Sequence, residues 1–274
     1  MSIDNSFIKK RITKMDHLFV LFSPVTHLPF VECDEETFDD QVYVFTTEEM
    51  TQTFARSYTG RKIPLQAVRI NTPMFQPLFS SLYLYGVTAV MLQEEGAPVR
   101  IPLADLAEPP ALDAEMAKKL PVSNPPLQLT ALYFMQELRR QVTERDADEK
   151  KHLQELEEEM AHNMLRSDYI VTFDTSQVKG EWNPKDKTAR VGVPMIKTKA
   201  GKAFQPVFTE VGEFRKFMAK NKDKRKMRLV KVPFDSLPRF LTKDAEGFIL
   251  NPAGFNLILP KGQVERIQKL YGEK

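Results

Sequence analysis

Residues 205–210 read Gln205-Pro206-Val207-Phe208-Thr209-Glu210, and Phe217 follows nine residues after Phe208. The same arrangement occurs earlier, where Val42-Tyr43-Val44-Phe45-Thr46-Thr47 is followed, nine residues after Phe45, by Phe54. In both places a short apolar run ends in a hydroxyl residue, which predicts a buried strand followed by a short helix. The second phenylalanine then falls on the apolar stripe of that helix and is expected to point into a core.

Further blocks flank both stretches in the same order. Upstream, Leu28-Pro29-Phe30-Val31 parallels Val193-Pro194-Met195-Ile196. Downstream, the turns Gln93-Glu94-Glu95-Gly96 and Asn251-Pro252-Ala253-Gly254 each separate two apolar runs, which predicts β-hairpins whose glycines adopt a positive φ. The offset between the copies is 163 residues at the phenylalanines and 158 at the turn. We interpret the blocks as an internal duplication; the alternative is two unrelated hairpins.

The predicted helix starts differ between the two copies. Thr46 and Glu49 have the spacing of a capping box, in which the hydroxyl and the carboxylate each bind a free backbone N–H. In the second copy Thr209 can cap the helix, but Gly212 takes the place of the glutamate. The box is therefore expected in the first copy and is incomplete in the second.

A helix-rich stretch separates the copies. It begins at Pro125-Pro126, extends to about Arg166, and contains two apolar stripes at helical spacing. The stripes are Leu127, Leu132, Met135, Leu138 and Val142, then Leu153, Leu156, Met160 and Met164. Because the stretch Glu144–Lys151 between them is charged, the sequence allows one continuous helix or two helices with a break near Arg145-Asp146.

These patterns predict an α+β (mixed α/β) protein with two similar small sheet-plus-helix domains joined by a helical connector. A chain of 274 residues is long enough for one or two domains. We place the first domain at residues 1–108, the connector at 109–166 and the second domain at 167–274.

The residues of the second copy indicate a family. Val207-Phe208-Thr209-Glu210 with Phe214 and Phe217, followed by the stretch 247–255 around the Asn-Pro-Ala-Gly turn, resembles the SseB (enhanced serine sensitivity protein B) N-terminal domain family. The first copy resembles it through Phe45-Thr46-Thr47-Glu48 but has Gln-Glu-Glu in place of Asn-Pro-Ala. The resemblance covers about 190 residues in two tandem copies. It implies a small bacterial α/β domain, and it brings no catalytic residues with it.

Composition excludes several classes of protein. The 39 basic and 37 acidic residues give a formal net charge of +2, which requires no polyanionic partner. Cys33 is the single cysteine, so the chain has no internal disulfide framework and no four-cysteine metal site. The carboxylates beside Cys33 disfavour a thiolate, and we expect a small, partly buried filler. This composition predicts a cytoplasmic protein. No apolar run reaches 18 residues, so we expect no membrane-spanning helix.

The sequence also lacks recognisable catalytic motifs. Neither glycine-rich phosphate loop occurs, and no Gly-x-Ser-x-Gly elbow is present. Two Glu-x-x-His units, Glu149–His152 and Glu159–His162, lie ten residues apart and cannot share one metal unless the connector folds back or a second chain contributes. His17 and His27 flank predicted strands and are expected to be structural. We therefore assign no catalytic residue, no metal site and no cofactor.

Charge is distributed unevenly along the chain. Residues 15–55 contain nine acids and no Lys or Arg, whereas residues 215–231 contain nine bases and one acid. The candidate anion- or partner-binding residues in the basic segment are Lys220, Lys222, Lys224, Arg225, Lys226 and Arg228. The segment fits a solvated face or protein contact, a nucleic-acid contact, or a small anionic ligand. It lacks the interleaved aromatic residues that stack on single-stranded nucleic acid.

The favoured function is that of a non-catalytic interaction or regulatory protein in the bacterial cytoplasm. Its partner is predicted to be a protein, including a second copy bound through the connector stripes. The alternatives are a nucleic-acid or anionic-ligand binder that uses residues 215–231, and an enzyme with a site between the domains.

Overall fold

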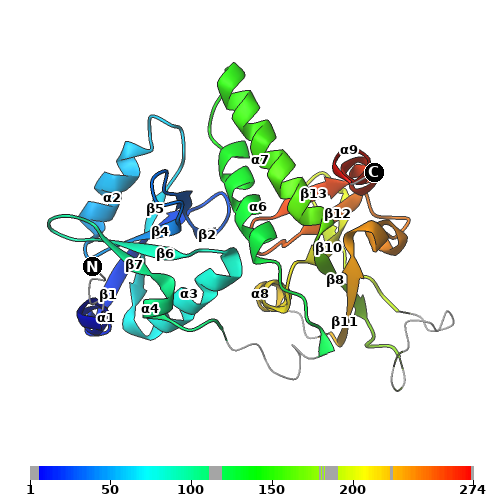
Figure 1. Ribbon diagram of the computed structural model, residues 1–274. Coiled ribbons are helices and arrows are strands. Elements are labelled where there is room, and N and C mark those ends of the chain that lie inside the picture. Colours follow the sequence, from blue (N-terminus) through cyan, green and yellow to red (C-terminus); the bar gives the residue numbers. More distant parts are fainter. Residues whose placement is uncertain are drawn as a thin grey trace. The chain divides into compact units, whose positions relative to one another are not determined.

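The structure is a computed structural model that describes residues 6–110, 119–178, 180, 182, 191–222 and 225–272 (Figure 1). Its contacts divide the chain into two compact units. Unit 1 takes Met1–Leu112 and Pro125–Glu157, and unit 2 takes Asp113–Asn124 and Glu158–Lys274. Residues 109–166, the predicted connector, are thus shared between the two units.

Unit 1 is built on a mixed sheet. Its strands are β1 (His17–Ser23), β2 (Leu28–Pro29), β3 (Val31–Cys33), β4 (Asp40–Phe45), β5 (Gln66–Asn71), β6 (Ala89–Gln93) and β7 (Val99–Pro102). Its helical elements are α1 (Ser6–Ile12), α2 (Glu48–Ser57), η1 (Thr72–Met74), α3 (Phe75–Leu82), η2 (Tyr83–Tyr85), α4 (Leu103–Leu106) and α6 (Pro125–Leu138). Strand β4 is antiparallel to β1 and parallel to β6, and it is almost entirely buried, as expected for a strand inside a sheet.

Unit 2 has a sheet of the same kind. Its strands are β8 (Asp168–Asp174), β9 (Ile196–Lys197), β10 (Ala203–Phe208), β11 (Met227–Pro233), β12 (Gly247–Leu250) and β13 (Leu257–Pro260). Its helical elements are α8 (Val211–Asn221), η3 (Phe234–Phe240) and α9 (Gln263–Tyr271). Helix α7 (Ala147–Leu165) belongs to unit 1 up to Glu157 and to unit 2 from Glu158.

The two sheets share their strand order and directions. In unit 1 the pairs are β5–β1, β1–β4, β4–β6 and β6–β7, and in unit 2 they are β11–β8, β8–β10, β10–β12 and β12–β13, with only the third pair parallel in each. The register also agrees, because Val44 lies opposite Leu92 and Val207 lies opposite Leu250, which preserves the offsets of 163 and 158 residues. The predicted α+β class with two sheet-bearing domains is confirmed. That the two arose by duplication stays a prediction.

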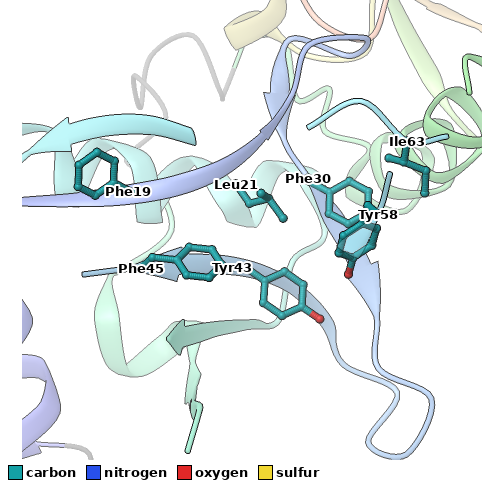
Figure 2. Close-up of a cluster of buried hydrophobic side chains, with 7 residues drawn as sticks. All are labelled: Phe19, Leu21, Phe30, Tyr43, Phe45, Tyr58 and Ile63. Atoms are coloured by element: carbon teal, nitrogen blue, oxygen red, sulfur yellow. The ribbon is translucent and has the colours of Figure 1, made fainter. Parts of the chain in front are cut away.

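An aromatic cluster forms a core of unit 1 (Figure 2). Its buried members are Phe19, Leu21, Phe30, Tyr43, Phe45, Tyr58 and Ile63. Phe54 of α2 packs against this cluster, with its ring centre 4.6 Å from that of Tyr43 and 5.3 Å from that of Phe45. The prediction that Phe54 points from the helix into a core is confirmed.

The equivalent cluster of unit 2 is centred on Phe208, which is fully buried. Phe217 of α8 lies 5.5 Å from it and is only 8% exposed, so the second predicted core phenylalanine is also confirmed. Leu120 and Val122, from the chain segment before α6, complete the cluster. Unit 2 therefore takes part of its core from residues that precede its sheet in the sequence.

The helix caps differ from the predicted ones. Helix α2 is capped by Thr47, whose hydroxyl accepts a hydrogen bond from the N–H of Met50, so the predicted box of Thr46 and Glu49 is wrong by one residue. Thr209 does not cap α8, because Glu210 occupies the N-cap position. The hydroxyl of Thr209 instead accepts a hydrogen bond from the side-chain amide of Asn251 (2.8 Å).

In the Asn-Pro-Ala-Gly turn, Gly254 lies close to another side chain and does not adopt a positive φ. Both hairpins form as predicted, and Gly96 has the expected positive φ of 117°. In the second turn, however, Asn251 carries the positive φ (47°), so the prediction for Gly254 is wrong. A Cβ on Gly254 would lie 2.7 Å from Oε2 of Glu213, so a larger residue here would require this buried carboxylate to shift.

The helical stretch contains two helices, α6 and α7. Of the two alternatives that the sequence allowed, one continuous helix or two helices, the structure shows two. The side chain of Asp146 accepts a hydrogen bond from the N–H of Glu149 (2.8 Å), and a carboxylate oxygen of Glu149 accepts one from the N–H of Asp146 (3.3 Å). This is a capping box that begins α7, so the chain restarts as a new helix after the gap.

None of the helices among the described residues is both long and apolar enough to cross a membrane.

Candidate anion-binding surface

The basic segment 215–231 covers most of α8 and β11. Lys220 lies exposed in the last turn of α8. Lys222 ends the helix in a left-handed conformation with a φ of 49°, and its N–H donates to the carbonyls of Met218 and Ala219. Lys224 lies outside the described residues.

Two residues that follow strand β8, Thr175 and Ser176, form hydrogen bonds with the backbone of Lys226. The N–H of Lys226 donates to the hydroxyl of Ser176 (2.9 Å), and the carbonyl of Lys226 accepts from the N–H and the hydroxyl of Thr175 (2.8 and 3.0 Å). Arg228 is exposed and lies opposite Phe173 in the ladder between β11 and β8. Lys226 and Arg228 therefore project from a hydrogen-bonded backbone.

An open hollow of about 640 Å³ lies beside the C-terminal end of α8 and strand β9. Eight residues line it, and we call it the basic hollow: the cationic Lys197, Lys222 and Arg225, the polar Asn221, and the apolar Pro194, Met195, Ile196 and Phe217. Phe217 is buried, Met195 and Ile196 are half-buried, and the three cationic residues are exposed. The surface therefore combines an apolar floor with a positively charged rim.

The hollow brings together only some of the predicted site residues. Lys222 and Arg225 line it, whereas Lys220, Lys226 and Arg228 are exposed outside it. Lys197 was missed by sequence reasoning because it lies on β9, well before the basic segment. The available signal was its position directly after the Val193–Ile196 block, which the repeat predicted to be structured.

Acids of unit 2 pair with part of the basic segment. Lys216 contacts Glu213 (2.6 Å), and Lys231 contacts Asp168 (2.6 Å). Arg225 lies 3.4 Å from Asp174, whose pKa is lowered mainly by hydrogen bonds from Ser176 and further by Arg225. An exposed pair of this kind is worth only about 0–1 kcal/mol, so Arg225 can still contact an anionic ligand.

The side chains that line the basic hollow are suited to binding an anion beside an apolar group. They comprise two amines, a guanidinium, a carboxamide, a thioether, alkyl groups and an aromatic ring. Lys and Arg side chains bind carboxylates and phosphates. Elsewhere, Cys33 is exposed rather than partly buried as predicted. Among the described residues, no group of three or more His, Cys, Asp or Glu side chains is arranged to hold a metal ion.

A protein-family model matches the part of the chain that contains most of unit 2. Residues 145–266 match the family model of the SseB protein N-terminal domain. Residues 145–266 are SseB-like. The match covers β8 to β13 with α8, so the basic hollow is part of the SseB-like region. No curated protein matches the chain.

Two solved structures match nearly the whole chain. "Anabaena Tic22 (protein transport)" is 11% identical and covers 96% of this chain and 97% of that one, with a TM-score of 0.21. "Tic22 from Plasmodium falciparum" is 13% identical and covers 97% of this chain and 99% of that one, with a TM-score of 0.20. At these TM-scores neither likeness carries an argument about the fold or function of this chain.

Proposed function

We propose that this chain is a non-catalytic interaction protein of the bacterial cytoplasm, and that it binds an acidic segment of a protein partner in the basic hollow of its SseB-like unit. One observation carries the proposal: the cationic residues Lys197, Lys222 and Arg225 line the same hollow as the apolar residues Met195, Ile196 and Phe217. A ligand that matches this surface has carboxylates beside an apolar side chain. An acidic peptide segment with a bulky residue has both.

The floor favours a peptide over single-stranded nucleic acid. Proteins that hold single strands without sequence preference stack the bases on accessible aromatic rings. Phe217 is only 8% exposed and packs against Phe208, so its ring offers little face for stacking. Residues 218–233 contain no aromatic side chain. The positive rim therefore suits carboxylates held next to an apolar group better than a row of stacked bases.

Fluorescence anisotropy tests this proposal with a labelled peptide that has one phenylalanine flanked on each side by two glutamates. We compare the parent protein with Lys197→Glu plus Lys222→Glu, which reverses the rim. The control is Lys220→Glu plus Lys226→Glu, which makes the same change in net charge outside the hollow. Rim reversal is expected to weaken binding by about tenfold or more, because attractive pairs become repulsive, while the control changes it little.

Two results would refute the peptide reading. One is equal weakening by the rim variant and the control, which indicates a diffuse electrostatic attraction. The other is a labelled ten-nucleotide oligothymidine that binds the parent more tightly than the peptide does and loses affinity on rim reversal. That result would favour the nucleic-acid alternative, and the slope of affinity against salt would then count the phosphates contacted.

A further inference from the structure

The loop between β3 and β4 of unit 1 displays an exposed phenylalanine among acids. Phe38 is 78% exposed, more than any other large hydrophobic side chain among the described residues. Glu35 and Glu36 precede it and are also exposed. We call residues 34–39 the acidic loop. Its composition is that of the ligand proposed for the basic hollow: carboxylates beside one bulky apolar group.

Hydrogen bonds within the acidic loop hold it in one conformation. The N–H of Asp34 donates to the carbonyl of Asp39, and the N–H of Phe38 donates to the carbonyl of Asp34 (both 2.9 Å). Oδ1 of Asp34 accepts from the N–H groups of Glu36 (3.1 Å) and Thr37 (2.8 Å). Phe38 has a φ of 56°, an uncommon conformation for a bulky residue, and it persists because the surrounding bonds enforce it.

Arg100 of β7 anchors the end of this loop. It donates hydrogen bonds to both carboxylate oxygens of Asp39, at 2.5 and 2.8 Å. This contact keeps Asp39 ionised and lowers its pKa to about 2. Asp39 is therefore part of the support, and Asp34 is engaged by the loop backbone, which leaves Glu35, Glu36 and Phe38 facing solvent. A preorganised group of this kind loses little conformational entropy when it binds.

We propose that the acidic loop of one copy of this chain docks into the basic hollow of a second copy, with Phe38 against the floor and Glu35 and Glu36 beside the cationic rim. This rests on the proposed function of the hollow and names its occupant. Charge complementarity selects it: the loop contributes exposed carboxylates, and the hollow contributes Lys197, Lys222 and Arg225. Because every copy carries both surfaces, each copy offers a loop and a hollow, and two reciprocal contacts of this kind make a two-fold dimer.

The apolar stripes of the helical stretch are less suited to this role. Leu127, Leu132 and Met135 of α6 are at most 2% exposed, and α6 contacts η2 and β3 of unit 1. Met160 and Met164 of α7 are also buried. Self-association through these buried members would require them to leave their present packing. Leu138 is 40% exposed, and Leu153 and Leu156 are half-buried, so only part of each stripe is accessible.

Sedimentation velocity of the full chain tests the docking. The parent is expected to dimerise at tens of micromolar and to dissociate as salt is raised. Phe38→Ser is expected to be monomeric at the same concentration, and it alters a side chain that supports no core. A matched pair of charge changes on exposed α7 residues, Glu155→Lys plus Glu159→Lys, is expected to leave the dimer intact.

Mixing two variants with reversed charges is the decisive experiment. Glu35→Lys plus Glu36→Lys reverses the loop, and Lys197→Glu plus Lys222→Glu reverses the hollow; each variant alone is expected to be monomeric. When the two are mixed, each loop again faces a hollow of opposite charge, and a mixed dimer is expected. Recovery on mixing also shows that both variants are folded.

The proposal is overturned by a parent that stays monomeric at about 100 micromolar, by a dimer that survives Phe38→Ser, or by reversed variants that remain monomeric when mixed. The peptide assay distinguishes a failure of the self-docking proposal from a failure of the proposed function of the basic hollow. If the glutamate–phenylalanine peptide binds the hollow while the parent is monomeric, self-docking fails and the proposed function stands. If the peptide does not bind either, both fail.

Discussion

Replacing Glu210 by glutamine should change how the stability of unit 2 depends on pH. Glu210 is the N-cap residue of α8 and is only 2% exposed. Its Oε1 atom has no hydrogen-bond partner among the described residues. Burial and the neighbouring charge of Glu213 raise the pKa of Glu210 from an ordinary value near 4.5 to about 7, although Lys216 acts in the opposite direction.

The size of the change in unfolding free energy follows from the difference between the pKa of Glu210 in the folded chain and in the unfolded chain. Between about pH 4.5 and 7 the unfolded chain loses this proton while the folded chain keeps it, so stability falls as pH rises. One pKa unit corresponds to about 1.4 kcal/mol, so the full loss above pH 7 is about 3 kcal/mol. Glutamine cannot ionise. Relative to the parent, Glu210→Gln should therefore gain about 3 kcal/mol between pH 4.5 and pH 8.

Urea unfolding at a series of pH values measures this gain. Trp182 is the only tryptophan of the chain and packs against Phe173 of β8, so its fluorescence reports on unit 2. Glu246→Gln, at an exposed position of the same unit, controls for the loss of one carboxylate. A stability difference between Glu210→Gln and the parent that stays constant from pH 4.5 to 8 would refute the reasoning, because Glu210 would then ionise as it does in the unfolded chain.

Three further substitutions test the packing. Gly254→Ala should destabilise unit 2 by about 1–3 kcal/mol in urea unfolding, because its Cβ would meet the Glu213 carboxylate, and a gain in stability would contradict the close approach. Asp146→Ala should cost about 0.5–2 kcal/mol by removing the α7 capping box, and circular dichroism should show lost helix; equal loss from Lys151→Ala would argue against a specific cap. Gly247→Ala should prevent unit 2 from folding, since its Cβ would lie 2.1 Å from a β13 carbonyl; native Trp182 fluorescence would contradict this.

The sheets and cores were predictable because their signals are local and repeated. Phe54 and Phe217 follow a strand at a fixed distance, so the helical period alone places them on the buried face. The hairpins follow from a glycine-containing turn between two apolar runs. The common offset then fixes which strands correspond, and the structure shows the same register in both sheets.

The missed details depend on contacts between distant segments. Thr46 and Thr47 are both able to cap a helix, and only the end of β4 decides between them. Gly254 reads as a turn residue, but its need for space comes from Glu213, in a helix far away in the sequence. Sequence alone cannot supply such a neighbour.

Only part of the candidate site could be predicted, because the rest also depends on contacts between distant segments. The density of Lys and Arg in residues 215–231 identified Lys222 and Arg225, but it did not distinguish them from the bases that lie outside the hollow. Lys197 joins them because β9 pairs with β10, which brings it to the end of α8. The exposed Phe38 likewise becomes visible only when burial is known, since an apolar residue in a sequence is otherwise expected inside.

A photo-crosslink from position 38 tests the central claim most directly. The parent chain is prepared with p-benzoylphenylalanine in place of Phe38, in ordinary and ¹⁵N-labelled form, and the two are mixed, irradiated and analysed by peptide mass spectrometry. The account predicts crosslinks between chains of different isotope content, from the acidic loop to Met195, Ile196 or Phe217. Crosslinks that occur only within one chain, or that join the loop to residues outside the basic hollow, would contradict it.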